Sequence, residues 1–326
     1  MKPIRLPANQ PPARFYQGGE RIAEFRGEGK AQPNTPEDWV GSTTSVRNCA
    51  PEGMTRLPDG RLLEDAVNSD PELWLGPEHV ARYGSDSMLL VKLLDAGQRL
   101  PVHAHPDGDF AASFVSAAHG KAEAWYILSP GTVYLSFTKD LSAEELFSFT
   151  KTQDISTLLS LMHEISVEPG DCVFVPHGVM HSIGAGIFLA EVQEPEDLSI
   201  LLEWEGFDLD GVKDGHLGLG FDVALTAVET TGRSKSEIEG LIRRGVVDEN
   251  ALTEEASPYF RLDKVDTRQD FLAGFAILIA LGDSVKLHLG DQEPLEVPSG
   301  STLLVPHAAG DFTVAGSALI ARPPLP

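Results

Sequence analysis

The chain has 326 residues, which is enough for two or three folding units that each bury a core. It carries 49 acidic and 25 basic residues, a formal net charge of −24, so long-range repulsion disfavours nucleic acid and anionic lipid as partners. Two cysteines make no disulfide framework, and no apolar run approaches the roughly 20 residues that cross a bilayer. The first residues lack the apolar core of a signal peptide, so a cytoplasmic location is expected.

The first 60 residues are rich in Pro, Gly and polar residues and predict a loop-rich segment with an edge strand over 38–46. A short helix is expected over 72–83, ending at Gly84. From Met88 onward, short apolar runs alternate with Gly, Pro and Asp, a spacing that predicts the strands of a sandwich or barrel. These runs cover residues 88–91, 124–128, 132–137, 164–167, 172–175 and 187–192.

Two helical segments interrupt the strand pattern. Ser142 and Glu145 have capping-box spacing and open a helical insertion near 140–163. Ser234 and Glu237 open a second helix, expected to end at Gly245. Strand texture returns over 259–322, so two β units flank a helical link. The fold class predicted is mainly β with helical insertions: an N-terminal barrel over 1–205, a helical linker over 206–256 and a C-terminal barrel over 257–326.

Three histidines stand at spacings that suit a metal site. Gly97 is followed after five residues by His103-Ala104-His105, and alternate residues of a strand point to one face, so both imidazoles project together. Gly170 is followed after five residues by Pro176, and then by Gly178 and His181. These are the two halves of the cupin signature. A lone buried histidine is usually a core residue, but two matched spacings favour His103, His105 and His181 as ligands.

A carboxylate would neutralise such a site, and Glu123 is the choice because it opens the next apolar strand. Three imidazoles and one carboxylate suit Zn²⁺ first, with Mn²⁺ or Fe²⁺ as alternatives. In the C-terminal β unit, Ala308 and Asp311 stand where the signature has glycine and histidine, and no His-x-His precedes them. That unit is therefore expected to be metal-free.

The sequence resembles the type I phosphomannose isomerase family in segments spread over nearly the whole chain. The matching segments are 18–19, 38–39, 90–96, 102–107, 120–126, 167–171, 175–181, 190–194 and 257–260. The two β units flanking a helical link suggest a bicupin fold of two jelly-roll barrels. The resemblance implies a zinc enzyme that interconverts an aldose phosphate and a ketose phosphate through a cis-enediol. It places the metal ligands at His103, His105, Glu123 and His181, and it matches Lys92, Lys121 and Glu191 to positions that line the active site.

Two positions depart from the family pattern. The family usually has Gln where this chain has His103, which strengthens metal binding because imidazole is a better ligand than an amide. The family arginine ten residues beyond Glu191 is replaced here by Leu201, which offers no charge to an anionic substrate. Arg99, Arg261 or Lys213 could supply a cation instead.

The leading hypothesis is a metal-dependent aldose–ketose isomerase that acts on a sugar or sugar phosphate. Glu191, or hydroxide held by the metal, is the candidate base, and Lys121 could stabilise the enediolate. Alternatively, Lys121 only pairs with Glu123, and Glu191 only supports the metal site. A cupin dioxygenase, or a sugar- and metal-binding protein without turnover, are the competing functions. The sequence does not fix the sugar, the metal or the oligomeric state.

Overall fold

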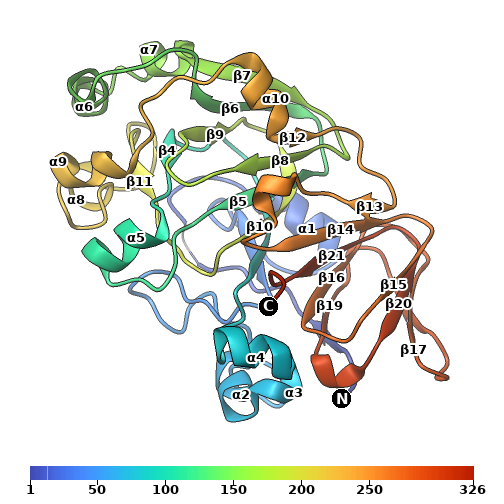
Figure 1. The fold of residues 1–326 in the computed structure, drawn as a ribbon. Helices are drawn as coiled ribbons and strands as arrows, with labels where there is room; N and C mark the ends of the chain where they lie inside the picture. The colour runs from blue at the N-terminus through green and yellow to red at the C-terminus, as the bar shows by residue number, and fades with distance from the viewer. Residues whose placement is uncertain (13) are drawn as a thin grey trace.

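The computed structural model describes residues 1–12 and 14–326. Within these residues the fold is mainly β, as predicted, and the strands form four antiparallel sheets (Figure 1). The sheets pack as two pairs, called here the first and the second sheet pair. No helix in the described part of the chain is long and apolar enough to cross a membrane.

The first sheet pair is built from the central part of the chain. Its six-stranded sheet has the order β12 (Ile242–Arg243), β8 (Cys172–Val175), β5 (Glu123–Ile127), β10 (Phe188–Gln193), β3 (Leu90–Asp95) and β2 (Glu37–Val40). Its five-stranded sheet has the order β11 (Ile200–Leu201), β4 (His103–Ala104), β9 (His181–Ile183), β6 (Gly131–Phe137) and β7 (Met162–Val167).

The second sheet pair is built mostly from the C-terminal part of the chain. Its six-stranded sheet has the order β1 (Ile4–Leu6), β19 (Thr302–Val305), β16 (Ala276–Ala280), β21 (Ala318–Arg322), β14 (Arg261–Val265) and β13 (Glu249–Asn250). Its four-stranded sheet has the order β15 (Arg268–Phe271), β20 (Phe312–Ala315), β17 (Val285–Leu289) and β18 (Leu295–Val297).

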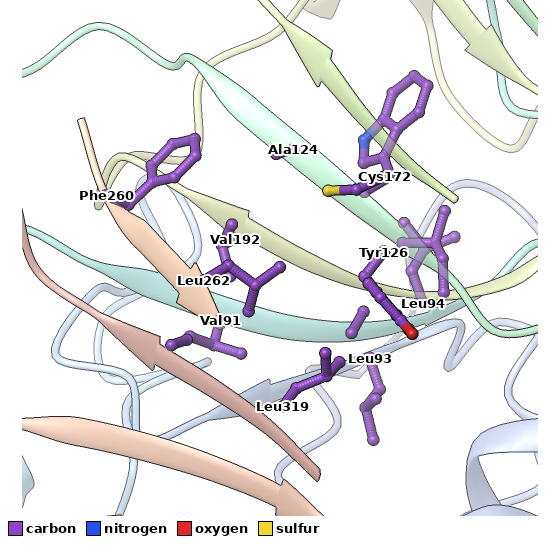
Figure 2. Close-up of a cluster of buried hydrophobic side chains, with 14 of the residues drawn as sticks. Val91, Leu93, Leu94, Ala124, Tyr126, Cys172, Val192, Phe260, Leu262 and Leu319 are labelled. Atoms are coloured by element: carbon purple, nitrogen blue, oxygen red, sulfur yellow. The ribbon is translucent and has the colours of Figure 1, made fainter. Parts of the chain in front are cut away.

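The two six-stranded sheets pack back to back and join the two pairs. Figure 2 shows this contact, where Val91 and Val192 of the first pair lie beside Leu262 and Leu319 of the second. Successive side chains of a strand lie on opposite faces of the sheet. The face of each six-stranded sheet that is not in this contact therefore faces the other sheet of the same pair. The inner face in the second pair is hydrophobic and buried, with Leu278 and Ile320 near its centre.

Helices are short and cover edges and outer faces. The helices that precede β5 in the chain are α1 (Glu20–Arg26), α2 (Leu63–Ser69), α3 (Pro71–Leu75), α4 (Pro77–Tyr83), α5 (Gly108–Phe110) and the π-helical η1 (Ala111–Val115). Those that follow are α6 (Ala143–Thr152), α7 (Ile155–Ser160), α8 (Gly211–Asp214), α9 (Phe221–Ala224), η2 (Leu225–Ala227), α10 (Lys235–Gly240), η3 (Glu254–Ala256) and η4 (His307–Ala309). Apolar residues of α6, α7 and α9 cover the outer face of the five-stranded sheet.

Both capping boxes form as predicted, at Ser142 with Glu145 and at Ser234 with Glu237. Three boundaries were predicted wrongly. The helix expected over 72–83 is broken into α3 and α4 at Gly76, whose φ of 94° is not helical. The edge strand expected over 38–46 is the shorter β2. The helix after Ser234 ends at Gly240 rather than Gly245, because Ile242 and Arg243 instead pair with β8.

The N-terminal residues contribute to the second sheet pair. Strand β1 pairs with β19, so Ile4 lies opposite Leu304 and Leu6 opposite Thr302. The segment between 206 and 256 likewise holds strands β12 and β13 in addition to its short helices. The boundaries at 205 and 256 stay a prediction, and the sheets show that segments far apart in sequence cross them.

Candidate metal centre and active site

Three buried histidines come together on the inner face of the five-stranded sheet. His103 lies on β4 directly opposite His181 on β9, and His105 follows two residues after His103. One nitrogen from each side chain lies within 4.8 Å of the others, which is close enough for all three to hold one metal ion. The two halves of the sequence signature therefore meet in space.

The backbone fixes which nitrogen of each imidazole faces the cluster. Nδ1 of all three histidines lies next to a main-chain carbonyl oxygen, which accepts hydrogen bonds but cannot donate them. The carbonyls belong to Pro101 for His103, Leu198 for His105 and Val179 for His181, at 2.8, 2.6 and 2.8 Å. Each Nδ1 therefore carries the proton, and each Nε2 keeps the lone pair that a metal needs. His181 Nε2 has no hydrogen-bond partner among the described residues.

Burial keeps the imidazoles of His103 and His105 neutral. It lowers the pKa of His103 well below its usual value, and the neighbouring His181 and His105 reinforce the effect. Burial and the Lys121 ammonium lower the pKa of His105 to about 3, although Glu123 opposes the shift. Near pH 7 both rings are therefore in the neutral form, with the proton on Nδ1 and the lone pair of Nε2 free to coordinate a metal.

Glu123 of β5 faces the histidines from the six-stranded sheet. Its Oε2 lies 3.0 Å from His105 Nε2, and its Oε1 lies 3.3 Å from His181 Nε2. The indole of Trp125 donates a hydrogen bond of 3.0 Å to Oε1. Burial raises the pKa of this carboxyl, but Lys121 and His105 outweigh burial and hold the pKa well below its ordinary value. Glu123 is therefore an ionised carboxylate beside the neutral imidazoles of His103 and His105.

This donor set fits a divalent metal ion. Histidine nitrogen and carboxylate oxygen are the ligands that Zn²⁺ and neighbouring transition metals take, and buried ligands held by backbone carbonyls are pre-oriented for them. Glu123 Oε2 is fully buried and has no partner in hydrogen-bond geometry among the described residues, and the Lys121 ammonium balances its charge as an ion pair. A buried carboxylate needs such a cation, and a divalent metal could serve in the same way.

Lys121 lies between two of these groups. Its Nζ is 2.8 Å from Glu123 Oε2 and 3.0 Å from His105 Nε2. A metal ion and an ammonium repel each other and would use the same lone pairs. Lys121 would therefore have to withdraw from His105 for a metal to bind there, and it would stay beside the site as a mobile cation.

Lys92 and Glu191 lie side by side on the same inner face. They are direct neighbours across β3 and β10, with Nζ and Oε1 3.3 Å apart. Burial raises the pKa of Glu191, and the nearby Glu123 raises it further, while Lys92 lowers it. Lys92 Nζ also lies 4.9 Å from the ring centroid of Trp39, which restricts its movement. The structure thus brings together all seven site residues that the sequence predicted.

A small cavity of about 40 Å³ lies above Glu123, Glu191 and Lys92. Sequence reasoning missed four ionisable residues that line it: Arg14, Tyr16, Glu37 and Asp197. Arg14 lies 3.3 Å from carboxylate oxygens of both Glu37 and Asp197. Arg14 and Asp197 are 183 positions apart, so no local pattern could have paired them.

Leu201, at the position of the missing family arginine, also lines this cavity. Of the cations named as substitutes, Arg99 is bound to Glu203 at 2.5 Å, and Lys213 lies on the short helix α8. Arg261 lines a different cavity, near the C-terminus. Arg14 lines the same cavity as Leu201, together with Lys92 and Lys121.

Comparisons with known proteins agree with the fold and the motifs, although no family model matches the chain. The chain is 29% identical over 203 residues to "Probable mannose-6-phosphate isomerase GmuF" of Bacillus subtilis, covering 60% of this chain and 59% of that protein. It is 26% identical over 267 residues to mannose-6-phosphate isomerase ManA of the same organism, covering 76% and 78%.

A solved structure of mannose 6-phosphate isomerase in its apo form, from Salmonella typhimurium, superposes over the whole length of both chains. The TM-score is 0.75 at 15% sequence identity, so this likeness concerns the fold. The sequence relatives and this structure thus agree with each other. In sequence and fold, the chain is thus similar to proteins named mannose-6-phosphate isomerase.

Proposed function

We propose that this chain is a metal-dependent aldose–ketose isomerase that acts on a sugar or sugar phosphate through a cis-enediol. The observation that carries the proposal is the cluster of three Nδ1-protonated histidines facing Glu123, with Glu191 on the same sheet. The names of the relatives support a reaction of the mannose-6-phosphate isomerase type.

His103, His105, Glu123 and His181 would hold the ion, with Zn²⁺ as the first choice and Mn²⁺ or Fe²⁺ as alternatives. A bound divalent metal would act as a Lewis acid on the oxygens at the first two carbons of the sugar. In this proposal the three backbone carbonyls keep the imidazoles oriented, and Trp125 keeps Glu123 oriented.

Glu191 would move the proton between the two carbons. As a carboxylate it would remove the proton from the carbon beside the carbonyl, and as the acid it would return that proton to the neighbouring carbon. A raised pKa favours this role because the carboxyl then both takes and gives a proton readily. Lys92 would hold Glu191 in position, and Lys121 would stabilise the negative charge that develops on oxygen.

Whether the substrate carries a phosphate is a separate part of the proposal. The three cations that line the cavity, Arg14, Lys92 and Lys121, are all paired with carboxylates. Ligand pockets usually measure about 300–1,000 Å³, so a cavity of about 40 Å³ must enlarge before a hexose enters. With Leu201 in place of arginine, we propose an unphosphorylated sugar as the better substrate, held beside Arg14.

We also propose that the two sheet pairs are two cupin-type barrels: a catalytic barrel within 1–205, a linker over 206–256 and a metal-free barrel over 257–326. The short helices between 206 and 256 support this division. Strand β1 is an exception, because residues 4–6 pair with β19 of the second sheet pair.

Deuterium exchange at C2 tests the isomerase directly. Purified protein would be incubated in D₂O with Zn²⁺ or Mn²⁺ and with mannose, fructose, lyxose or their 6- or 5-phosphates, and NMR would follow exchange at C2 of the aldoses and at C1 of fructose. We expect exchange that depends on metal and is faster with the unphosphorylated sugar. His181→Ala should abolish it, whereas His163→Ala should not, because His163 bonds to the carbonyl of Arg233 away from the cluster.

Absence of exchange with every sugar would sink the proposal. Oxygen uptake with Fe²⁺ would then favour a cupin dioxygenase. Tight sugar binding without turnover would favour a binding protein.

A further inference from the structure

A second, larger cavity of about 760 Å³ lies at one end of the second sheet pair, against α3, α4 and the last residues of the chain. Two arginines line it, Arg261 at the start of β14 and Arg322 at the end of β21. These residues are direct partners across the two strands. Their guanidinium groups are therefore neighbours at the same end of the sheet.

The two arginines belong to the inner face of the second pair. Along β14 the side chains alternate, and Val265, four residues after Arg261, lies in the core between the two sheets. Along β21 the same holds for Ile320, two residues before Arg322. The cavity is thus the open end of this sheet pair, and the mouth of a β-barrel is a preferred location for ligands.

Neither arginine is neutralised. Arg322 is only 8% exposed, and its Nε has no hydrogen-bond partner among the described residues. Its Nη2 donates to the carbonyl of Leu272 at 2.8 Å, and Arg261 Nε donates to the carbonyl of Pro323 at 2.6 Å. In the described part of the chain, no carboxylate oxygen lies within 4.0 Å of either guanidinium, although the protein is strongly acidic.

The carboxylates around the cavity are separated from the arginines or already occupied. Asp270 accepts a hydrogen bond from Thr313, and Asp311 accepts one from the backbone N–H of Ala273. Asp263 is close enough to influence both arginines without forming an ion pair. Burial, then repulsion from Arg322, lowers the pKa of Arg261 to about 10, as expected for two neighbouring cations without an ion-pair partner.

We propose that this cavity binds a small organic molecule with a phosphate or carboxylate group, held jointly by Arg261 and Arg322. Two guanidinium groups side by side offer the forked donors that such oxyanions accept. The ring of Phe271, 5.9 Å from the Arg322 guanidinium carbon, supplies an apolar wall for the rest of the molecule. The site is separate from the histidine cluster and shares none of its lining residues.

Titration of the full-length, metal-loaded protein with inorganic phosphate tests this site, at constant ionic strength set with KCl. Calorimetry would give the affinity, and thermal unfolding would give the rise in Tm. Acetate and glucose 6-phosphate would be compared in parallel to distinguish carboxylate from phosphate ligands. We expect saturable binding and a rise in Tm, because an anion would neutralise charges that are unpaired in the free protein.

Arg322→Met should weaken binding by about tenfold or more, since charge-assisted hydrogen bonds are lost. The same variant should raise Tm in the absence of phosphate, because it removes a buried charge without a partner. Arg268→Met, at an exposed position of β15, is the matched control and should leave phosphate affinity and Tm unchanged. Asp263→Asn should tighten binding, which gives a second measurement if the arginine variant folds poorly.

Binding that survives in Arg322→Met and is unaffected in Asp263→Asn would overturn the proposal. So would binding that disappears in His103→Ala, since it would then belong to the metal centre. Failure of the isomerase test has no bearing on these outcomes.

Discussion

The interiors of the two sheet pairs are filled differently. Between the sheets of the first pair lie ionisable side chains: His103, His105, His181, Glu123, Glu191, Lys92 and Lys121. Between the sheets of the second pair the core is hydrophobic, and the charges of Arg261 and Arg322 appear only at its open end. Buried charges cost free energy unless they are paired or bind an ion. The first interior therefore needs ion pairs or a bound ion to offset its charges, whereas the second is stabilised by apolar packing.

Replacing the proposed base gives the largest expected effect. Glu191→Gln should lower the rate of C2 exchange by about 10²–10⁴-fold, the usual contribution of general acid–base catalysis. Metal content, measured by plasma mass spectrometry, should stay the same because Glu191 is outside the histidine cluster. Glu164→Gln, an exposed glutamate of β7, is the control and should keep full activity. Equal activity in the two variants would remove Glu191 from the mechanism.

Matched leucine truncations compare the two interiors directly. Leu278→Ala, in the hydrophobic core of the second pair, should cost about 2–5 kcal/mol of unfolding free energy through cavity formation. Its metal affinity should not change. Leu135→Ala should cost a similar amount and also weaken metal binding, because Leu135 lies directly opposite His181 in the ladder. Urea denaturation and chelator competition would measure both, and a metal defect in Leu278→Ala would contradict the separation of the two interiors.

Features that depend on nearby residues were predictable from the sequence. Two capping boxes and most strand positions follow from local hydrogen bonding and apolar periodicity, and both helices begin where predicted. His103, His105 and His181 were recognisable because strand geometry and fixed turn spacings determine their relative positions. The break at Gly76 was missed because a glycine before Pro77 is compatible with one kinked helix or with two.

Features that depend on pairing between distant segments were not predictable. Arg14, in the loop-rich N-terminal segment, has no motif that indicates its position beside Asp197. Strand β1 could not be predicted either, because its three residues form a strand only by pairing with β19, about 300 positions later in the chain. The sequence likewise could not show that Arg322 Nε has no hydrogen-bond partner among the described residues, because this depends on every atom around it.

The ion pairs of Glu37 in the first sheet pair are buried, whereas the second sheet pair has an exposed ion pair between Lys286 and Glu296. Glu37 contacts both Arg14 and Lys92, at 3.3 and 3.8 Å. Glu37→Gln should cost about 3 kcal/mol, because it removes a shared partner from two buried cations. Glu296→Gln, which breaks an exposed pair with Lys286 on the second sheet pair, should cost about 0–1 kcal/mol. Chemical denaturation at pH 7 would measure both, and equal costs would break the comparison.

The pH dependence of the unfolding free energy should also distinguish the buried Glu37 from the exposed Glu296, with a smaller difference between the two variants. Burial opposes ionisation of Glu37, but Arg14 and Lys92 outweigh it and lower its pKa to about 2, from 4.5. A carboxyl whose pKa is lower in the folded state stabilises the protein above its unfolded pKa and loses that contribution as pH falls. Wild-type protein should therefore lose stability between about pH 4.5 and 2. Glu37→Gln, measured by urea denaturation of the metal-free protein, should lose less over that interval, while Glu296→Gln should follow the wild type. A Glu37→Gln curve parallel to the wild type would show that the charge of Glu37 does not stabilise the folded state.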